Sequence, residues 1–216
     1  MVGVLYLAGM AVGIPANVVA QSMLGSPSPS STIAASSTLL AVAVVGWLAT
    51  VVGDAAHGVL MFPILRRRSE RGAVGYLAAR IVDAVFIAVM ALLIVVQIPV
   101  GAAYLEAGGD ASYLQALSAV LTDASQYAYE FGMTAVGVAG LILCSRLLRA
   151  RLLPKALAVW GLVGYAILLG GSLLEILGFH LSSVQAGVGG LWEVFIGVWL
   201  IVKGFNPPGD AAGTGR

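Results

Sequence analysis

The sequence has few charged residues, a single cysteine and two histidines. Asp, Glu, Lys and Arg make up 10% of its 216 residues, whereas soluble globular domains carry about 25%. One cysteine excludes an internal disulfide and a zinc site built on cysteines. The chain has no basic run interleaved with aromatic residues, so nucleic acid is not an expected partner. It also has no Gly-rich phosphate loop, nucleophile elbow or HExxH helix, and we expect neither a cofactor nor a bound metal.

Hydrophobic residues, which make up 60% of the chain, are gathered into long runs. The hydrocarbon core of a bilayer is about 30 Å thick, and a helix needs about 20 apolar residues to cross it. Six stretches meet this requirement, at about residues 2–23, 38–65, 73–98, 119–147, 156–178 and 186–202. The segment 25–37, rich in Ser and Pro, is predicted to be a turn, and the segment after residue 98 a loop. These runs predict an all-α polytopic transmembrane bundle over residues 1–205, followed by a short flexible cytoplasmic tail, 206–216.

The basic residues predict the orientation of this bundle. Ten of the eleven Lys and Arg residues follow the second stretch, lie at or after the end of the fourth, or follow the sixth. With six spans these three regions share one side of the membrane. Cytoplasmic segments carry an excess of Lys and Arg, so that side is expected to be cytoplasmic, with both termini on it. The eleventh basic residue, Arg80, lies inside the third stretch.

Five ionisable residues from three stretches are predicted to share one depth in the membrane. Counting from the basic segments at about 1.5 Å per residue places Arg80 and His57 roughly 13 Å deep, Glu193 roughly 15 Å, and Asp54 and Asp83 roughly 18 Å. Asp54 and His57 are three residues apart and share a helix face. Arg80 and Asp83 have the same spacing.

Buried charges of this kind must find partners. A charged residue in the middle of a membrane helix costs about 2.5–3.5 kcal/mol even on a lenient insertion scale, and such residues normally face inward and pair. We expect a bridge from Arg80 to Glu193 or to Asp54, with Asp83 nearby. Three carboxyl groups against one Arg leave an excess of negative charge, which water, a proton or a bound cation must balance. The network either orients the helices or forms a binding site.

A second polar layer is predicted toward the outer face, and most of it is expected to be a solvated rim. Glu130 is the exception, because it reaches into the outer half of the fourth stretch. The layer consists of Asp123, Tyr127, Tyr129, Glu130, Glu175 and His180.

Glycine is frequent in the chain, with 28 residues. Small residues allow membrane helices to approach closely. The fourth and fifth stretches carry the candidates for such contacts, at Gly137, Gly140, Gly161, Gly164, Gly170 and Gly171.

Four segments carry a resemblance to a known family. They are GVLYLAGMAVGIPA (3–16), MFPILRRRSERGAVGYLAARIVDA (61–84), LLRARLLPKALAVWGLVGYAILLGG (147–171) and LWEVFIGVWLIVKGF (191–205). In this order they resemble the bacterial membrane family called domain of unknown function 4386. The resemblance implies six spans in the bacterial cytoplasmic membrane and recurrent polar positions at Asp54, Arg80, Glu193 and Pro154. The family name carries no activity.

Three hypotheses for the function follow from these residues. In the first, the mid-membrane cluster binds a proton, cation or small polar ligand, as in a transport or binding protein. In the second, the chain is a membrane enzyme acting on a lipid or isoprenoid-like substrate, with Asp54, Glu193 or Glu130 as acid or base and His57 assisting. In the third, the cluster only fixes helix packing in a structural or accessory subunit. The lipid bilayer is the expected partner, and a homo-oligomer or a further membrane partner stays open.

The three hypotheses predict different surroundings for the cluster. A water-lined cavity reaching one face of the membrane favours transport. A hydrophobic groove that opens laterally to lipid and ends at the acids favours the enzyme. A dry, tightly paired network without a cavity favours the structural subunit.

Overall fold

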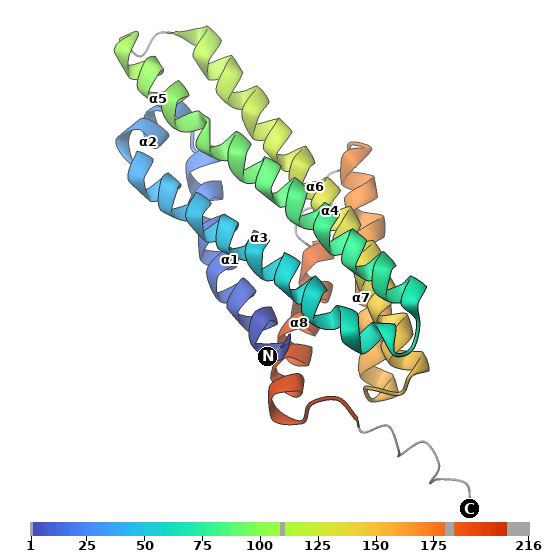
Figure 1. Ribbon diagram of the computed structural model, residues 1–216. Coiled ribbons are helices and arrows are strands. Elements are labelled where there is room, and N and C mark those ends of the chain that lie inside the picture. The colour runs from blue at the N-terminus through green and yellow to red at the C-terminus, as the bar shows by residue number, and fades with distance from the viewer. Residues whose placement is uncertain (1, 109–110, 180–183, 207–216) are drawn as a thin grey trace, which may run out of the picture.

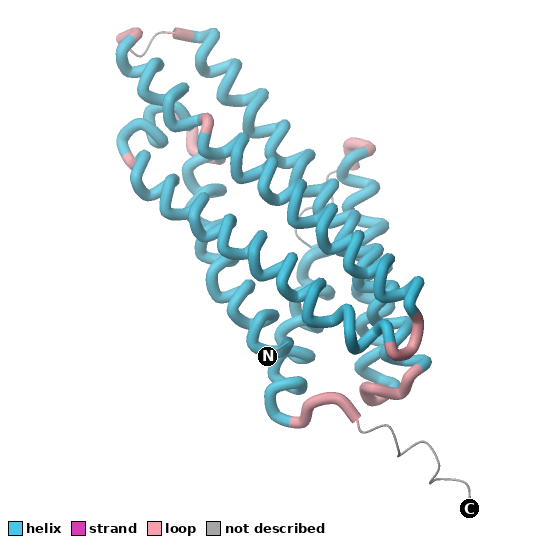
Figure 2. Tube along the Cα trace, viewed as in Figure 1, coloured by secondary structure: helices cyan, strands magenta, loops and turns pink. Residues whose placement is uncertain are grey.

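The computed structural model describes residues 2–108, 111–179 and 184–206, with side chains from Gly187 onward in the last range, and these residues form helices joined by short turns (Figures 1 and 2). The all-α prediction is confirmed for this part of the chain, which contains no strand. In chain order the helices are α1 (Val2–Leu24), α2 (Pro29–Ala35), α3 (Ser37–Arg66), α4 (Glu70–Val95), α5 (Gln97–Glu106), α6 (Ser112–Arg149), α7 (Lys155–Ile176) and α8 (Val184–Val202).

Local sequence signals set several of the helix ends. The hydroxyl of Ser69 accepts a 3.1 Å hydrogen bond from the backbone N–H of Gly72 at the start of α4, as an N-cap residue does. The chain leaves α5 and α7 through Gly108 (φ 76°) and Gly178 (φ 87°). Glycine adopts this left-handed conformation without a steric penalty, so it commonly ends helices.

Six of the helices form a ring. Around it, α1 packs against α3, α3 against α4, α4 against α6, α6 against α7, α7 against α8, and α8 against α1. Helices that follow one another in the chain are therefore neighbours, with α2 and α5 added at one end (Figure 1). The α3–α4 and α6–α7 turns lie at the opposite end, together with the start of α1 and the end of α8.

The length and apolar composition of its helices identify the chain as a multi-pass membrane protein. Five helical stretches among the described residues are long and apolar enough to cross a bilayer, namely Val2–Leu24, Ser37–Arg66, Glu70–Glu106, Ser112–Arg149 and Lys155–Ile176. The described apolar part of α8, Gly187–Val202, is shorter. The predicted stretches at 2–23, 38–65 and 156–178 agree with α1, α3 and α7 to within about two residues.

Two segments differ from the prediction. Residues 29–35, predicted as part of a turn, form α2, and residues 97–106, predicted largely as a loop, form α5. The two helices cover each other: Ile33 is fully buried, and a Cβ on Gly101 would lie 2.8 Å from the carbonyl oxygen of Ser30. Tertiary packing therefore stabilises helices that are too short or too polar to be recognised from hydropathy.

The bundle is longer than a membrane is thick. The helix α6 has 38 residues and begins seven residues before the predicted stretch. At about 1.5 Å per residue it is about 57 Å long, whereas the hydrocarbon core is about 30 Å thick. The end that carries α2, α5 and the start of α6 contains polar pairs. In one of them the hydroxyl of Ser118 donates a 2.6 Å hydrogen bond to Gln97. This end therefore combines helix length in excess of the hydrocarbon thickness with paired polar side chains.

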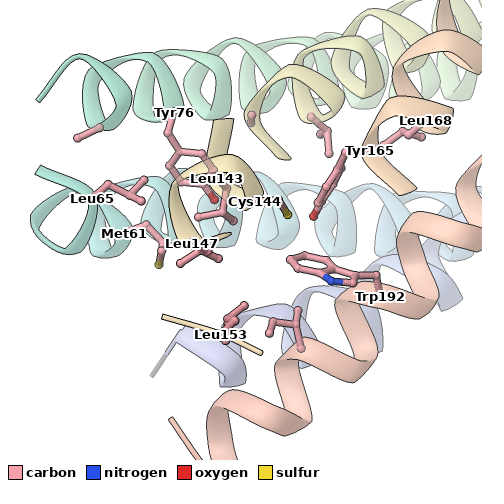
Figure 3. Packing of buried hydrophobic residues seen from close by; sticks show 14 residues of the cluster. Met61, Leu65, Tyr76, Leu143, Cys144, Leu147, Leu153, Tyr165, Leu168 and Trp192 are labelled. Carbon is pink, nitrogen blue, oxygen red and sulfur yellow. The ribbon is translucent and has the colours of Figure 1, made fainter. Parts of the chain in front are cut away.

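Two apolar clusters occupy the interior of the ring. One lies toward the basic turns, contains Leu65, Leu147 and Trp192, and is shown in Figure 3. The other lies toward α2 and contains Ile33 and Ile94.

The glycines predicted to bring helices together do so at several positions. A Cβ on Gly137 would lie 3.0 Å from the Cα of Leu169, and one on Gly140 would lie 2.1 Å from the ring of Tyr165. Gly161 and Gly164 also lie against a neighbouring helix, whereas nothing lies within 4 Å of a Cβ built on Gly170. The first four glycines therefore serve helix contact, and Gly170 does not.

Candidate intramembrane site

The ring of helices encloses a cavity of about 690 Å³. All six ring helices contribute to its lining. Its polar groups include Asp54, His57, Arg80, Asp83 and Glu193. The structure thus brings all five residues predicted for the mid-membrane cluster to one cavity.

Arg80 of α4 forms the ionic centre of this cavity. Its Nη2 donates a hydrogen bond to Oδ1 of Asp54 on α3, and its Nη1 lies 3.2 Å from Oδ2 of Asp83 one turn further along α4. The side chains of Arg80 and Asp83 are 11% and 1% exposed, and that of Asp54 is 32% exposed. Of the two bridges that the sequence allows, the structure contains the one to Asp54.

A glycine lets α3 and α4 approach at this point. A Cβ on Gly58 would lie 3.1 Å from the Cβ of Arg80 and 3.1 Å from Leu77. Gly58 is four residues after Asp54, so the two share a face of α3. The absent side chain leaves room for the stem of Arg80, whose guanidinium then reaches Asp54.

His57 belongs to the same interface. Its Nδ1 lies 2.6 Å from the hydroxyl of Tyr76 on α4, and its ring lies edge-on to Tyr6 of α1, with ring centroids 4.4 Å apart. His57 is 3% exposed. The imidazole therefore connects three helices, and its Nε2 is left for another partner.

Glu193 of α8 is held separately from Arg80. Its Oε1 accepts a 2.8 Å hydrogen bond from the hydroxyl of Tyr165 on α7, and no ion pair to it occurs in the described ranges. Tyr165 packs edge-on to Trp192 with ring centroids 5.3 Å apart, as Figure 3 shows. The ring of Tyr165 lies directly over the backbone of Gly140, which has no side chain to displace it.

Several buried polar atoms of the cavity have no hydrogen-bond partner among the described residues. They are Nε2 of His57, Nε of Arg80 and both carboxylate oxygens of Asp83. Asp83 does retain its ion pair with Arg80. Buried polar groups in folded proteins are almost always paired with protein, water or ligand. The indole Nε1 of Trp47, another residue of the cavity wall, belongs to the same group. The polar residues around the cavity are therefore not all matched by partners in the described part of the chain.

The cavity reaches the surface of the bundle between α1 and α8. Its lining includes Ile14 and Val18 of α1 and Leu191 and Val194 of α8, which are 55%, 62%, 65% and 40% exposed. All four side chains are aliphatic. Asn17 of α1 is also exposed and lines the cavity. The entrance is therefore mostly hydrophobic, while the charged groups lie inside.

The chain was compared with known proteins and protein families. A family model described as "Domain of unknown function (DUF4386)" matches residues 1–204. The chain belongs to the DUF4386 family. This confirms the resemblance found in the sequence, and no curated protein or solved structure matches.

The residues predicted for the outer polar layer of this DUF4386 protein do not all line the cavity. Asp123 and Tyr127 are exposed. Glu130 is 3% exposed and accepts a 2.9 Å hydrogen bond from Gln126, but it does not line the cavity. Tyr129, predicted for the same layer, lines the cavity. Glu175 is half-buried on α7, and His180 lies outside the described residues.

The prediction missed the aromatic residues of the site. Three of them, Tyr6, Trp47 and Tyr165, line the cavity of this DUF4386 member. A fourth, Tyr76, forms a hydrogen bond with His57. Counting depth would have found Tyr165, which is ten residues past Lys155 just as Glu193 is ten before Lys203.

Proposed function

We propose that the chain crosses the bacterial cytoplasmic membrane six times, with the start of α1 and the end of α8 on the cytoplasmic side. The support is the ring of helices, in which α8 lies between α7 and α1. Sequential antiparallel helices close a ring only when their number is even, so α8 has to cross in the direction opposite to α1. The basic turns then share one face, as the excess of cytoplasmic Lys and Arg requires.

Within this topology, the protein binds an amphipathic ligand whose polar end meets the mid-membrane cluster. The observation that carries this proposal is a 690 Å³ cavity, lined by all six ring helices, on whose wall Asp54, His57, Arg80, Asp83 and Glu193 converge. Ligand sites are concave and mostly apolar, with a few converging polar groups. The aliphatic entrance between α1 and α8 admits a hydrocarbon chain from the bilayer.

A purely structural role for the cluster accounts less well for the same features. A network that only fixes packing is expected to be tightly paired and to leave little space beside it. Here a cavity of about 690 Å³ lies beside the network instead. The cavity volume therefore favours binding.

Glycines in the cavity wall provide the test. A Cβ on Gly9 meets nothing within 4 Å, and Gly9 lines the cavity, so Gly9→Phe fills the space without a clash at Cβ. Gly170 is equally unobstructed but lies away from the cavity, so Gly170→Phe is the matched control. The protein is extracted in mild detergent and its retained small molecules are identified by native mass spectrometry. We expect a retained lipophilic ligand in the unmodified protein and in Gly170→Phe, and its loss in Gly9→Phe. Equal retention by all three proteins would overturn the proposal.

A second candidate function, a membrane enzyme on a lipid-like substrate, is favoured by the lateral position of the entrance. It needs an acid or base at the ligand's polar end, and Glu193, Asp54 and His57 line that part of the cavity. The two functions differ in the state of the recovered ligand. If the protein only binds the ligand, the ligand recovered after incubation has an unchanged mass. If the protein is an enzyme, a product of different mass is recovered.

A further inference from the structure

The charges of the cavity point to the kind of polar end that the ligand carries. One guanidinium and three carboxyl groups line the cavity, at Arg80 and at Asp54, Asp83 and Glu193. Both terminal nitrogens of Arg80 are engaged, one with Asp54 and one with Asp83. Arg80 therefore serves the two aspartates, and among the described residues Glu193 has a hydrogen bond from the hydroxyl of Tyr165 and no ion pair.

We propose that the cavity binds a cationic amphiphile, an ammonium group on a hydrocarbon chain, with the ammonium group between Glu193 and the aromatic residues of the cavity wall. This inference rests on the proposed function and adds the charge of the ligand. A carboxylate near the bilayer centre is costly without a counter-charge. A ligand cation supplies that counter-charge, where the described residues of the protein do not.

Aromatic residues in the cavity wall favour an ammonium group over other cations. Tyr6, Tyr129, Tyr165 and Trp47 all line the cavity. Electron-rich ring faces attract organic cations, and quaternary ammonium groups are commonly recognised in this way. The described residues contain no group of three or more His, Cys, Asp or Glu placed to hold a metal ion, which leaves an organic cation as the better fit.

An anionic head is disfavoured by the same arrangement. Both terminal nitrogens of Arg80 already bind carboxylates, those of Asp54 and Asp83, so an anionic head would have to compete with them for the guanidinium. It would also lie among three carboxyl groups and be repelled by them. The hydrophobic entrance is equally suited to any aliphatic chain, so the charge of the head decides the preference.

The test compares three probes with the same alkyl chain on the full-length protein in phosphatidylcholine nanodiscs. The probes are dodecyltrimethylammonium, dodecanol and dodecanoate, and binding is measured by calorimetry with empty nanodiscs subtracted. We expect dodecyltrimethylammonium to bind about tenfold or more tightly than dodecanol, and dodecanoate to bind weakest. This comparison uses the unmodified chain and does not depend on the folding of any variant.

Two variants test whether Glu193 causes the preference for the cationic probe. Glu193→Gln keeps an acceptor for the Tyr165 hydroxyl and removes the charge, so it should weaken dodecyltrimethylammonium binding and abolish its preference over dodecanol. Asp123→Asn removes a charge from an exposed position outside the cavity and should change neither.

The outcomes separate this inference from the proposed function. Equal binding of the three probes, with loss of all three in Gly9→Phe, would reject the cationic head and leave amphiphile binding intact. Tightest binding of dodecanoate would reject the cationic head in the same way. If Gly9→Phe binds every probe as the unmodified protein does, both the cationic head and the proposed amphiphile site would be rejected.

Discussion

The hydroxyl of Tyr165 donates a 2.8 Å hydrogen bond to Glu193, and this bond joins α7 to α8 at the wall of the cavity. It depends on a third residue, because the ring of Tyr165 occupies the place where a side chain on Gly140 of α6 would lie. A small residue on one helix thus sets the position of an acid on another. The contact links close packing of the helices to the polar site.

Gly140→Ala tests this link. The added methyl would lie 2.1 Å from the ring of Tyr165, so the ring must move and the bond to Glu193 is lost. Overpacking of this kind costs about 1–3 kcal/mol. We expect a lower midpoint of thermal unfolding in detergent and weaker ligand retention. Gly170→Ala, where a Cβ meets nothing within 4 Å, should unfold like the unmodified protein. An unchanged midpoint for Gly140→Ala would contradict the packing described here.

Arg80→Ala is expected to be the most damaging substitution in the cavity. It leaves Asp83, which is 1% exposed, without its only ionic partner among the described residues. Removing one partner of a buried ion pair costs about 3–5 kcal/mol. The expected result is a protein that unfolds at a much lower denaturant concentration, or that fails to accumulate in the membrane.

The companion experiment removes the stranded charge as well. Asp83→Asn in the Arg80→Ala background eliminates the unpaired carboxylate, so it should restore much of the lost stability. Glu106→Gln, an exposed position on α5, is the control second change and should restore nothing. If Asp83→Asn fails to rescue, the loss in Arg80→Ala comes from packing of the long side chain and not from the buried charge.

The depth of the charged residues could be predicted because helix rise is constant. Counting from the basic turns placed Asp54, Arg80 and Glu193 at one level, and all three line one cavity. Counting does not give the rotation of each helix about its axis, so it left open which acid meets Arg80. The structure pairs Arg80 with Asp54 because Gly58 brings α3 against α4. Glu193 approaches from α8, whose rotation is set by its contacts with α1 and α7.

The short helices at the far end could not be predicted for a different reason. Hydropathy identifies segments that lipid would stabilise. The helices α2 and α5 are stabilised instead by their contacts with each other and with the rest of the protein. Tyr104 shows this: it is 7% exposed although its segment was predicted to be a loop. Its hydroxyl accepts a 2.8 Å hydrogen bond from Gln115 of α6. Such partners are distant in sequence and carry no local pattern.

Tyr76→Phe should lower stability without closing the cavity. It removes the hydroxyl that lies 2.6 Å from Nδ1 of His57 and leaves both imidazole nitrogens without a described partner. A buried polar atom left unpaired costs about 1–3 kcal/mol. We expect a lower unfolding midpoint that the added ligand partly restores. Tyr113→Phe, on an exposed residue, is the control. Identical midpoints for the two variants would show that the contact between Tyr76 and His57 contributes nothing.

Labelling of single cysteines tests the six-span topology, and Lys203 is the decisive position. The native thiol of Cys144 is fully buried, so Cys144→Ser gives an unreactive background. In this background Arg68→Cys, Ala107→Cys and Lys203→Cys each place a thiol at an exposed position. A maleimide that cannot cross membranes is added to intact cells or to lysed cells. With six spans, Ala107→Cys reacts in intact cells, whereas Arg68→Cys and Lys203→Cys react only after lysis. If α8 does not cross the membrane, Lys203→Cys reacts in intact cells together with Ala107→Cys, and the closed ring of membrane-crossing helices is rejected.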